Sequence, residues 1–126
     1  MISEELRKYI DMVLKEEQDD VLHEMANLGP IDHGIRDVVI WVGKANKQHG
    51  LRVKISNSKN RWNNDDNFVI QMPNLDYDAN QVARWITSDI MKKIQEWIVL
   101  NQQVLYDFET DKIMYTRDFL NQISKI

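Results

Sequence analysis

The sequence predicts an α+β protein in which an N-terminal helix precedes a three-stranded antiparallel meander, and two or three C-terminal helices pack on one face of the sheet. Residues 51–56 alternate apolar and polar side chains without a fault, which is the period of a half-buried strand. Both ends of the chain instead repeat apolar residues at helical spacing. Short connections favour antiparallel neighbours, and a length of 126 residues fits one domain, residues 1–126.

Residues 3–28 are predicted to form the N-terminal helix. Ser3 is placed to cap it, and Glu4 and Glu5 complement the positive end of the helix dipole. The polar run at 16–20 leaves open whether this is one helix or two, and Gly29-Pro30 is expected to end it. Its apolar residues recur at helical spacing: Leu6, Ile10, Val13, Leu14, Val21, Met25 and Leu28.

Three strands are predicted in the middle of the chain. Residues 35–42 are rich in β-branched side chains, as expected of a well-buried strand. In residues 51–56 the apolar side chains are expected to face the core, with Arg52 and Lys54 on the opposite face. The third strand, residues 68–72, ends at the proline that follows it.

The C-terminal half is predicted to be helical. Asp78 is expected to cap a first helix, and residues 87–89 either continue this helix or start another. A last short helix is expected after Thr116. Three tryptophans at apolar-periodic positions are predicted to lie in the core: Trp41, Trp85 and Trp97. An amphipathic stripe that one small sheet does not fully cover is an alternative homodimer face: Ile90, Ile94, Trp97, Ile98 and Leu105.

The composition narrows the function classes. The chain has no cysteine, which excludes disulfides, thiolate nucleophiles and zinc–thiolate sites. No apolar run approaches the roughly 20 residues that span a bilayer, and the acidic N-terminus lacks the apolar core of a signal peptide. The expected location is therefore the cytoplasm, of a cell or of a host infected by a virus.

The net charge of −4 is distributed very unevenly. Residues 38–64 contain no Asp or Glu and carry a segment charge of +6, so the rest of the chain carries −10. Such an imbalance is a hint about partners rather than about fold. The cations of this segment are Lys44, Lys47, Arg52, Lys54, Lys59 and Arg61.

These six cations and Trp62 form the predicted binding site. Cations bind phosphate or carboxylate, an aromatic ring offers a stacking face for a base, and the neighbouring asparagines can read base edges. The alternative is that the cations pair with the acidic helices or cover a solvated face. Long duplex nucleic acid is a poor ligand because the −10 elsewhere repels a long polyanion at all but close range. A compact anionic ligand, a short single strand or an acidic protein surface fits better.

Catalytic and metal sites have weak support. Surface or turn positions are the simplest interpretation of His23, His33 and His49, since no serine beside them has an activated context. The aspartates at 65, 66, 76 and 78 do not follow the calcium-loop pattern, and Gly43-Lys44 lacks the rest of a phosphate loop. No metal and no cofactor is therefore expected.

Three short segments are similar to a known family. His49-Gly50-Leu51-Arg52-Val53-Lys54, then Phe68-Val69-Ile70, then Ile94-Gln95-Glu96-Trp97-Ile98 resemble small uncharacterised bacterial and phage proteins with a Pro-Pro-His-Phe-His strand and a Glu-Trp-Ile/Leu helix. The resemblance covers residues 35–109, lacks the Pro-Pro, and has Leu51 in place of the second histidine. Family members often lie beside a small antitoxin-like partner, which implies a regulatory or interaction role.

The sequence thus predicts a small non-catalytic binding protein, an inhibitor or regulator of a protein or nucleotide-like target. A metal-independent ribonuclease-like toxin is a second hypothesis, with His49 as general acid or base and Arg52 and Lys54 stabilising the developing negative charge. A structural scaffold that assembles through the C-terminal helices is the third.

Overall fold

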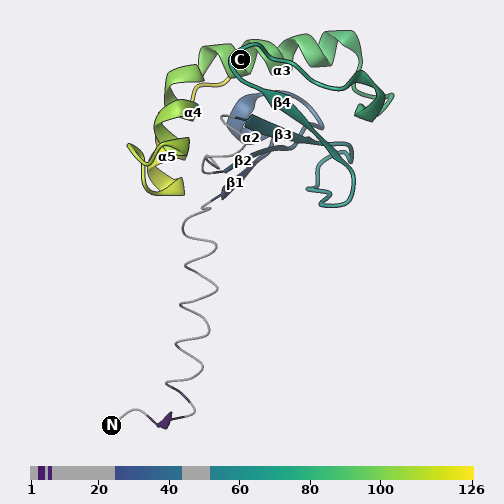
Figure 1. Cartoon of the computed structure of the whole chain (residues 1–126). Coiled ribbons are helices and arrows are strands. Elements are labelled where there is room, and N and C mark those ends of the chain that lie inside the picture. Colours follow the sequence, from purple (N-terminus) through teal and green to yellow (C-terminus); the bar gives the residue numbers. More distant parts are fainter. Residues whose placement is uncertain (1–2, 5, 7–24, 44–51) are drawn as a thin grey trace.

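The computed structural model describes residues 3–4, 6, 25–43 and 52–126, and has an α+β fold. Its sheet has four antiparallel strands in the order β1-β2-β3-β4, rather than the three expected. Helices α3, α4 and α5 lie together on one side of this sheet (Figure 1). The strands are β1 (Met25–Leu28), β2 (Ile40–Gly43), β3 (Arg52–Ser56) and β4 (Asn67–Gln71).

Strand β1 corrects the prediction that the N-terminal helix continues to residue 28. Met25–Leu28 pairs with Ile40–Gly43, and the burial along β1 alternates. Ala26 and Leu28 face the core, while Met25 is 45% exposed. Met25 and Leu28 are three residues apart, which is also a helical spacing. A segment of four residues is therefore compatible with both the strand period and the helix period. Leu6 N donates to Ser3 Oγ at 3.1 Å, as predicted for a capping serine. The rest of the predicted helix lies outside the described residues.

The segment between β1 and β2 differs from the prediction in two ways. Gly29-Pro30 does not simply end an element: it begins helix α2 (Pro30–His33), with Gly29 as the N-cap and the proline in the first turn. Strand β2 then starts at Ile40 instead of residue 35. Val38 and Val39 are buried although they precede the strand, and Val39 O accepts from Ser56 N on β3 at 3.0 Å.

Strand β3 follows the predicted alternation, and β4 lies one residue earlier than the predicted range 68–72. Val53 and Ile55 are fully buried on one face of β3, and Phe68 and Ile70 lie on the same face of β4. Lys54 pairs with Trp41 on β2 and with Val69 on β4. The helices therefore cover one face of the sheet, and the face that carries Lys54 points away from them.

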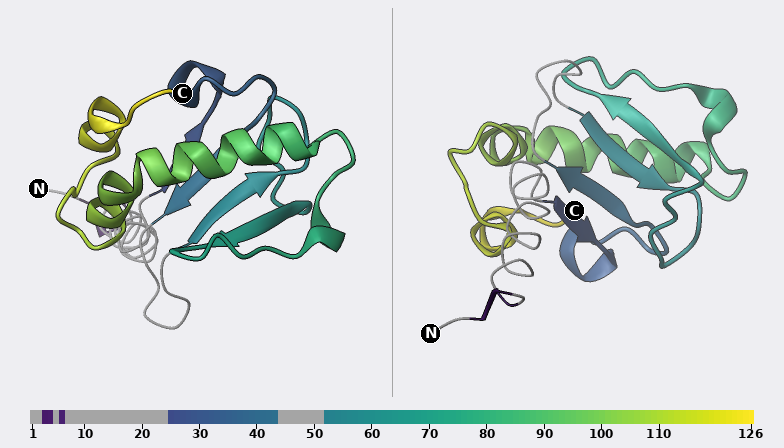
Figure 2. Two further views of the ribbon diagram at one scale, coloured as in Figure 1. Left: turned by 90° about the horizontal axis from the view of Figure 1, so that it is seen from above. Right: turned by 60° about the horizontal axis from the view of Figure 1, so that its bottom comes forward.

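Residues 79–122 form the helical layer (Figure 2). Asp78 caps the 3₁₀ helix η1 (Ala79–Gln81), which is shorter than the helix expected there, and Thr87 caps α3 (Ser88–Leu100). The predicted single stripe is divided at Asn101 between α3 and α4 (Gln102–Glu109), and α5 (Thr116–Gln122) follows. Among the described residues, no helix is long and apolar enough to cross a membrane.

The apolar stripe of α3 and α4 does not form a homodimer face. Ile94, Trp97, Ile98 and Leu105 are 0–1% exposed, and Ile90 packs against the same core. The four-stranded sheet and α5 together cover the stripe, whereas the three-stranded sheet of the prediction would have left part of it open. These residues therefore lie in the core of the single chain, and homodimerisation itself stays a prediction.

Candidate functional site

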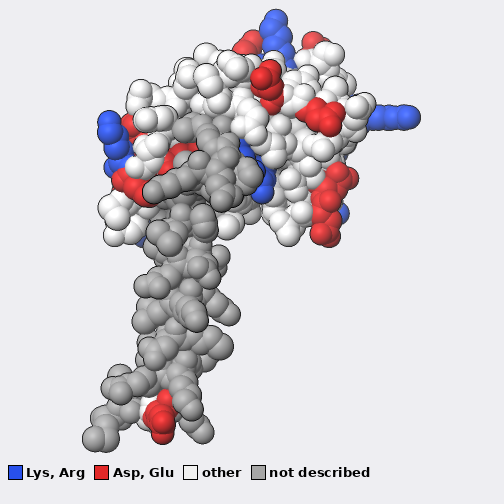
Figure 3. Space-filling view, viewed as in Figure 1, with Lys and Arg blue, Asp and Glu red and all other residues white. Residues whose placement is uncertain are grey.

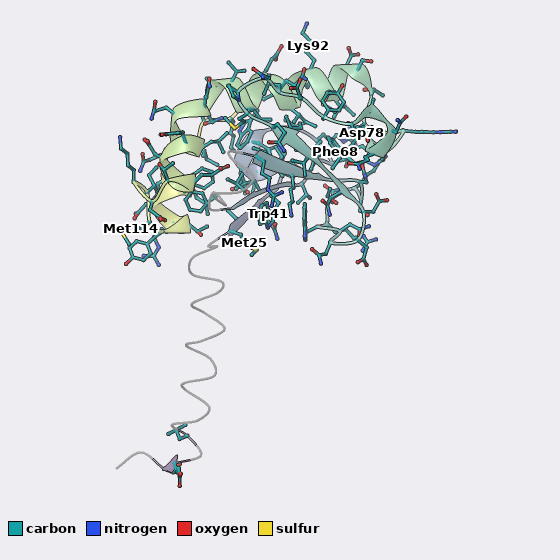
Figure 4. All side chains as sticks on the ribbon, viewed as in Figure 1. Met25, Trp41, Phe68, Asp78, Lys92 and Met114 are labelled. Carbon is teal, nitrogen blue, oxygen red and sulfur yellow. The ribbon has the colours of Figure 1, made fainter. Side chains whose placement is uncertain are left out.

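The face of the sheet opposite the helices, here called the outer face, collects the chemically distinctive side chains. Its residues come from all four strands and include Met25 on β1, Trp41 on β2, Arg52 and Lys54 on β3, and Val69 on β4. Figure 4 shows Trp41 and Met25 on the side of the sheet away from Lys92, which projects from α3. Trp41, Arg52, Lys54 and Val69 are partly exposed.

Trp41 lies over the backbone of Gly43 on the outer face. A Cβ atom at Gly43 would be 2.4 Å from Trp41 Cη2 and 2.8 Å from Cζ2, so the indole occupies the space of a side chain. Gly43 is buried by this contact. The indole Nε1 also donates to the Met25 sulfur at 3.2 Å, which fixes the orientation of the ring between β1 and β2.

Trp62 reaches the outer face from the loop between β3 and β4. The buried Ser56 hydroxyl donates to Arg61 O at 2.7 Å and accepts from Ser58 N at 3.1 Å, which folds the loop back at the residue before Trp62. Asn63 Oδ1 accepts from Asp65 N and Asp66 N, closing a turn directly after Trp62. The loop is therefore held on both sides of the tryptophan.

The two indoles form a pair, here called the tryptophan platform (Trp41 and Trp62). Their ring centroids are 6.3 Å apart and their planes differ by 25°, a near-parallel arrangement. Lys54 Nζ lies 4.7 Å from the Trp41 ring centroid, within the range of a cation–π interaction. Arg52 is two residues from Lys54 on the same face of β3.

The electrostatics of the outer face favour an anion. Burial, and secondarily the positive charge of Arg52, lowers the pKa of Lys54. Among the residues that the structure describes, no ion pair involves Arg52 or Lys54. In the described part of the chain, these two cations therefore do not pair with the acidic helices. The other alternative, that they cover a solvated face, stays a prediction. A bound anion would neutralise the repulsion between them.

The other predicted cations do not join this group. Lys59 Nζ lies 5.5 Å from the Trp85 ring centroid, so its charge is directed to a different tryptophan. Arg61 is exposed in the loop. Lys44, Lys47 and His49 lie outside the described residues. On the visible surface in Figure 3, basic side chains are scattered singly and do not gather in one patch.

Side-chain amides of three loop asparagines, Asn57, Asn60 and Asn63, make hydrogen bonds that hold the loop. Asn57 Nδ2 donates to Asp66 Oδ1 at 2.7 Å and to Gln81 O at 2.8 Å, and its Oδ1 accepts from Ala83 N. Asn60 Nδ2 donates to Asp37 Oδ1 at 2.9 Å. The Asn57 amide uses its donor and acceptor atoms within the fold.

His33, predicted at a surface or turn position, is completely buried. Its Nδ1 accepts from Ile35 N at 2.9 Å, which assigns the proton to Nε2, and Nε2 donates to Val38 O at 2.9 Å and Leu28 O at 3.2 Å. Burial lowers the pKa of His33. Every ring nitrogen is used, so His33 is structural and not an acid or base for a ligand.

Trp41 is the site residue that sequence reasoning missed. It was predicted in the core with Trp85 and Trp97. Trp97 is fully buried, Trp85 is half-buried with its Nε1 bonded to Asn57 O at 2.8 Å, and Trp41 lies on the outer face. The signal was present in the alternation Ile40-Trp41-Val42, in which the two flanking residues face the core. Because this strand was predicted to be well buried, Trp41 was predicted to lie in the core.

A separate pocket of about 640 Å³ lies where α3 meets α4. Its apolar lining includes Met72, Pro73, Val99, Leu100 and Tyr106, with two glutamines. It contains no charged side chain and shares no residue with the outer face. The distinctive charge and aromatic chemistry of the described residues therefore lies on the outer face of the sheet and not in this pocket.

Replacing Gly43 with alanine is expected to displace the Trp41 ring, because the new methyl group would overlap the indole. The signal that two paired indoles give in far-ultraviolet circular dichroism should weaken, while the free energy of unfolding changes by about 1 kcal/mol or less. Gln71→Ala, at an exposed position of β4, is the matched control. An unaltered indole signal in Gly43→Ala would show that Trp41 is not seated on this glycine.

Comparison of the chain with protein-family models, with curated proteins and with solved structures gives no match. The resemblance described above therefore stays a prediction, and the function is argued from the geometry of the site.

Proposed function

We propose that this is a non-catalytic binding protein, an inhibitor or regulator, whose outer face binds a compact anionic, nucleotide-like ligand. The observation that carries the proposal is the tryptophan platform with Lys54 over one ring and Arg52 beside it. Stacking a base on an indole and neutralising a phosphate with a cation are the two contacts that such a ligand needs.

The same geometry disfavours an acidic protein surface as the ligand. The face of an aromatic ring carries partial negative charge, which attracts the Lys54 ammonium and repels a carboxylate. A carboxylate at this site would bind Arg52 and Lys54 but gain nothing from the indoles. A planar base with an attached phosphate uses both kinds of group.

The two other hypotheses have less support. The ribonuclease-like toxin depends on His49, which lies outside the described residues, so it stays a prediction. The scaffold hypothesis depended on the stripe of α3 and α4, and that stripe is buried in the core. Cytoplasmic location also stays a prediction.

The test is a titration of the purified protein with a nucleoside monophosphate, followed by tryptophan fluorescence. Arg52→Glu combined with Lys54→Glu should weaken binding at least tenfold, because a hydrogen bond to a charged group contributes about 1.5–3 kcal/mol. Lys92→Glu is the control, since Lys92 is an exposed cation on the helical side (Figure 4). Equal affinity of the double variant and the wild type would disprove the proposal.

A further inference from the structure

The outer face presents its groups in two rows that cross the strands. The first row runs Trp41, Lys54, Val69 over β2, β3 and β4. The second pairs Arg52 with Gln71. Neighbouring strands are about 4.8 Å apart, so the first row spans about 10 Å. The contact groups are thus spread over a surface longer than one phosphate group.

The two cations occupy different places on this surface. Arg52 and Lys54 are two residues apart on one strand, so their Cα atoms are separated by about 6.5 Å. Two successive phosphodiesters, each with one negative charge, can contact one cation each at these separate positions on β3. A single phosphate group must reach both cations from one position.

The tryptophan platform favours single-stranded over double-stranded nucleic acid as the ligand. An indole stacks on a base whose face is free, and in a duplex the neighbouring base pairs already cover both faces of each base. Trp62 projects from a loop that hydrogen bonds hold over the sheet, so the ring is preorganised to receive an unstacked base. An open sheet face crossed by an aromatic pair and two cations suits an extended single strand.

Resting on the proposed function, we infer that the ligand of the outer face is a single-stranded oligonucleotide that runs from the tryptophan platform along β3, past Lys54 to Arg52. One base stacks on the tryptophan platform, and two successive phosphodiesters contact Lys54 and Arg52. Gln71 and Val69 extend the same surface along the path of the strand. The affinity should therefore be higher for a short oligonucleotide than for a mononucleotide. It should also fall as the salt concentration rises.

The experiment measures the affinity of the full chain for uridine monophosphate, for hexameric oligouridylate, for hexameric oligothymidylate and for a hairpin duplex, by tryptophan quenching over a range of salt concentrations. The hexamers should bind at least about tenfold more tightly than the mononucleotide, since further contacts are added. Two neutralised phosphates predict a slope of log K against log salt of about −1.4 for a single strand, at about −0.7 per phosphate.

Variants separate the two kinds of contact. Arg52→Gln should reduce the magnitude of the slope to about 0.7, because one phosphate contact is lost. Trp62→Ala should weaken binding about tenfold with the slope unchanged, and Trp62→Phe should restore most of the affinity because a stacking ring is retained. Lys92→Gln should leave both the affinity and the slope as in the wild type. Circular dichroism of each variant verifies that the fold is retained.

The outcomes distinguish this inference from the proposed function. Equal affinity for the mononucleotide and the hexamers overturns the inference and leaves the proposed function standing. Equal or tighter binding of the duplex also overturns it. Failure of every nucleotide and oligonucleotide to bind at low salt overturns both. Preference for oligouridylate over oligothymidylate would identify RNA as the source of the strand, and equal affinity would mean that the face recognises chemistry common to both.

Discussion

Replacing His33 with leucine is expected to lower the free energy of unfolding by about 3–5 kcal/mol, because three buried backbone groups lose their hydrogen-bond partner. The groups are Leu28 O at the end of β1, and Ile35 N and Val38 O in the segment that leads to β2. The imidazole therefore connects α2 to β1 and to the segment that precedes β2. Urea denaturation measures the loss.

The same residue makes stability depend on pH. The pKa of His33 in the folded protein is lower than in the unfolded chain, because burial disfavours the imidazolium. Below about pH 6.5 the unfolded chain takes up a proton that the folded protein does not, so stability falls as the pH is lowered. The stability that the neutral imidazole contributes is complete above about pH 6.5. It is lost progressively as the pH falls towards the lower pKa of His33 in the folded protein.

A comparison of variants isolates this effect from other titrating groups. In His33→Gln, the part of the stability change between about pH 7.5 and about pH 5.5 that comes from the imidazole should disappear. The control is Ile31→Thr, since Ile31 is 79% exposed on the same helix, and it should keep the pH dependence of the wild type. An identical pH profile in His33→Gln and the wild type would contradict the assignment of a buried neutral histidine.

Local patterns predicted the elements whose period is unambiguous. Strand β3 has five residues with strict alternation, and the structure places it where the sequence did. Residues 87–89 were predicted either to continue a helix or to start another, and the structure starts α3 there, with the Thr87 hydroxyl accepting from Ile90 N at 3.3 Å. In these segments the intrinsic preference and the tertiary environment agree.

The predictions fail where contacts with a distant part of the chain determine the local structure. β1 is a strand because β2 pairs with it, although its apolar residues also fit a helix. His33 is buried because Trp97 packs on it, with ring centroids 6.2 Å apart, and because Ile126 N donates to its carbonyl at 3.1 Å. The tryptophan platform joins residues 41 and 62 through the fold of a loop. None of these contacts has a signature in a short stretch of sequence.

The break between α3 and α4 is another such case. Apolar residues continue at helical spacing from Trp97 and Ile98 to Leu105 and Phe108, so the pattern alone predicts one helix. The structure divides it at Asn101, which is 1% exposed and ends α3. Its amide makes three hydrogen bonds that a helix surface residue would not make. The polar residue within the apolar pattern was the available signal.

Replacing Asn101 with alanine is expected to lower the free energy of unfolding by about 2–4 kcal/mol. Asn101 Nδ2 donates to Trp97 O and to Ser124 O, each at 2.9 Å, and its Oδ1 accepts from Ser124 N at 2.7 Å. This amide therefore holds the residues after α5 against the α3–α4 junction. Hydrogen exchange should become faster at Ser124 N and at Ile126 N, and Gln102→Ala, at an exposed neighbouring position, should change neither the exchange nor the stability.

Asn101→Asp sharpens the test because it conserves the shape of the side chain. The carboxylate can still accept from Ser124 N, but it places negative charge against Trp97 O and Ser124 O, which previously accepted hydrogen bonds. At neutral pH the loss of stability should therefore equal or exceed that of the alanine variant. Because burial and the two carbonyls raise the pKa of this carboxyl, the folded protein binds the proton more tightly, and the deficit relative to the wild type should shrink as the pH falls. A deficit that is constant with pH would mean that the amide donors of Asn101 do not hold these carbonyls.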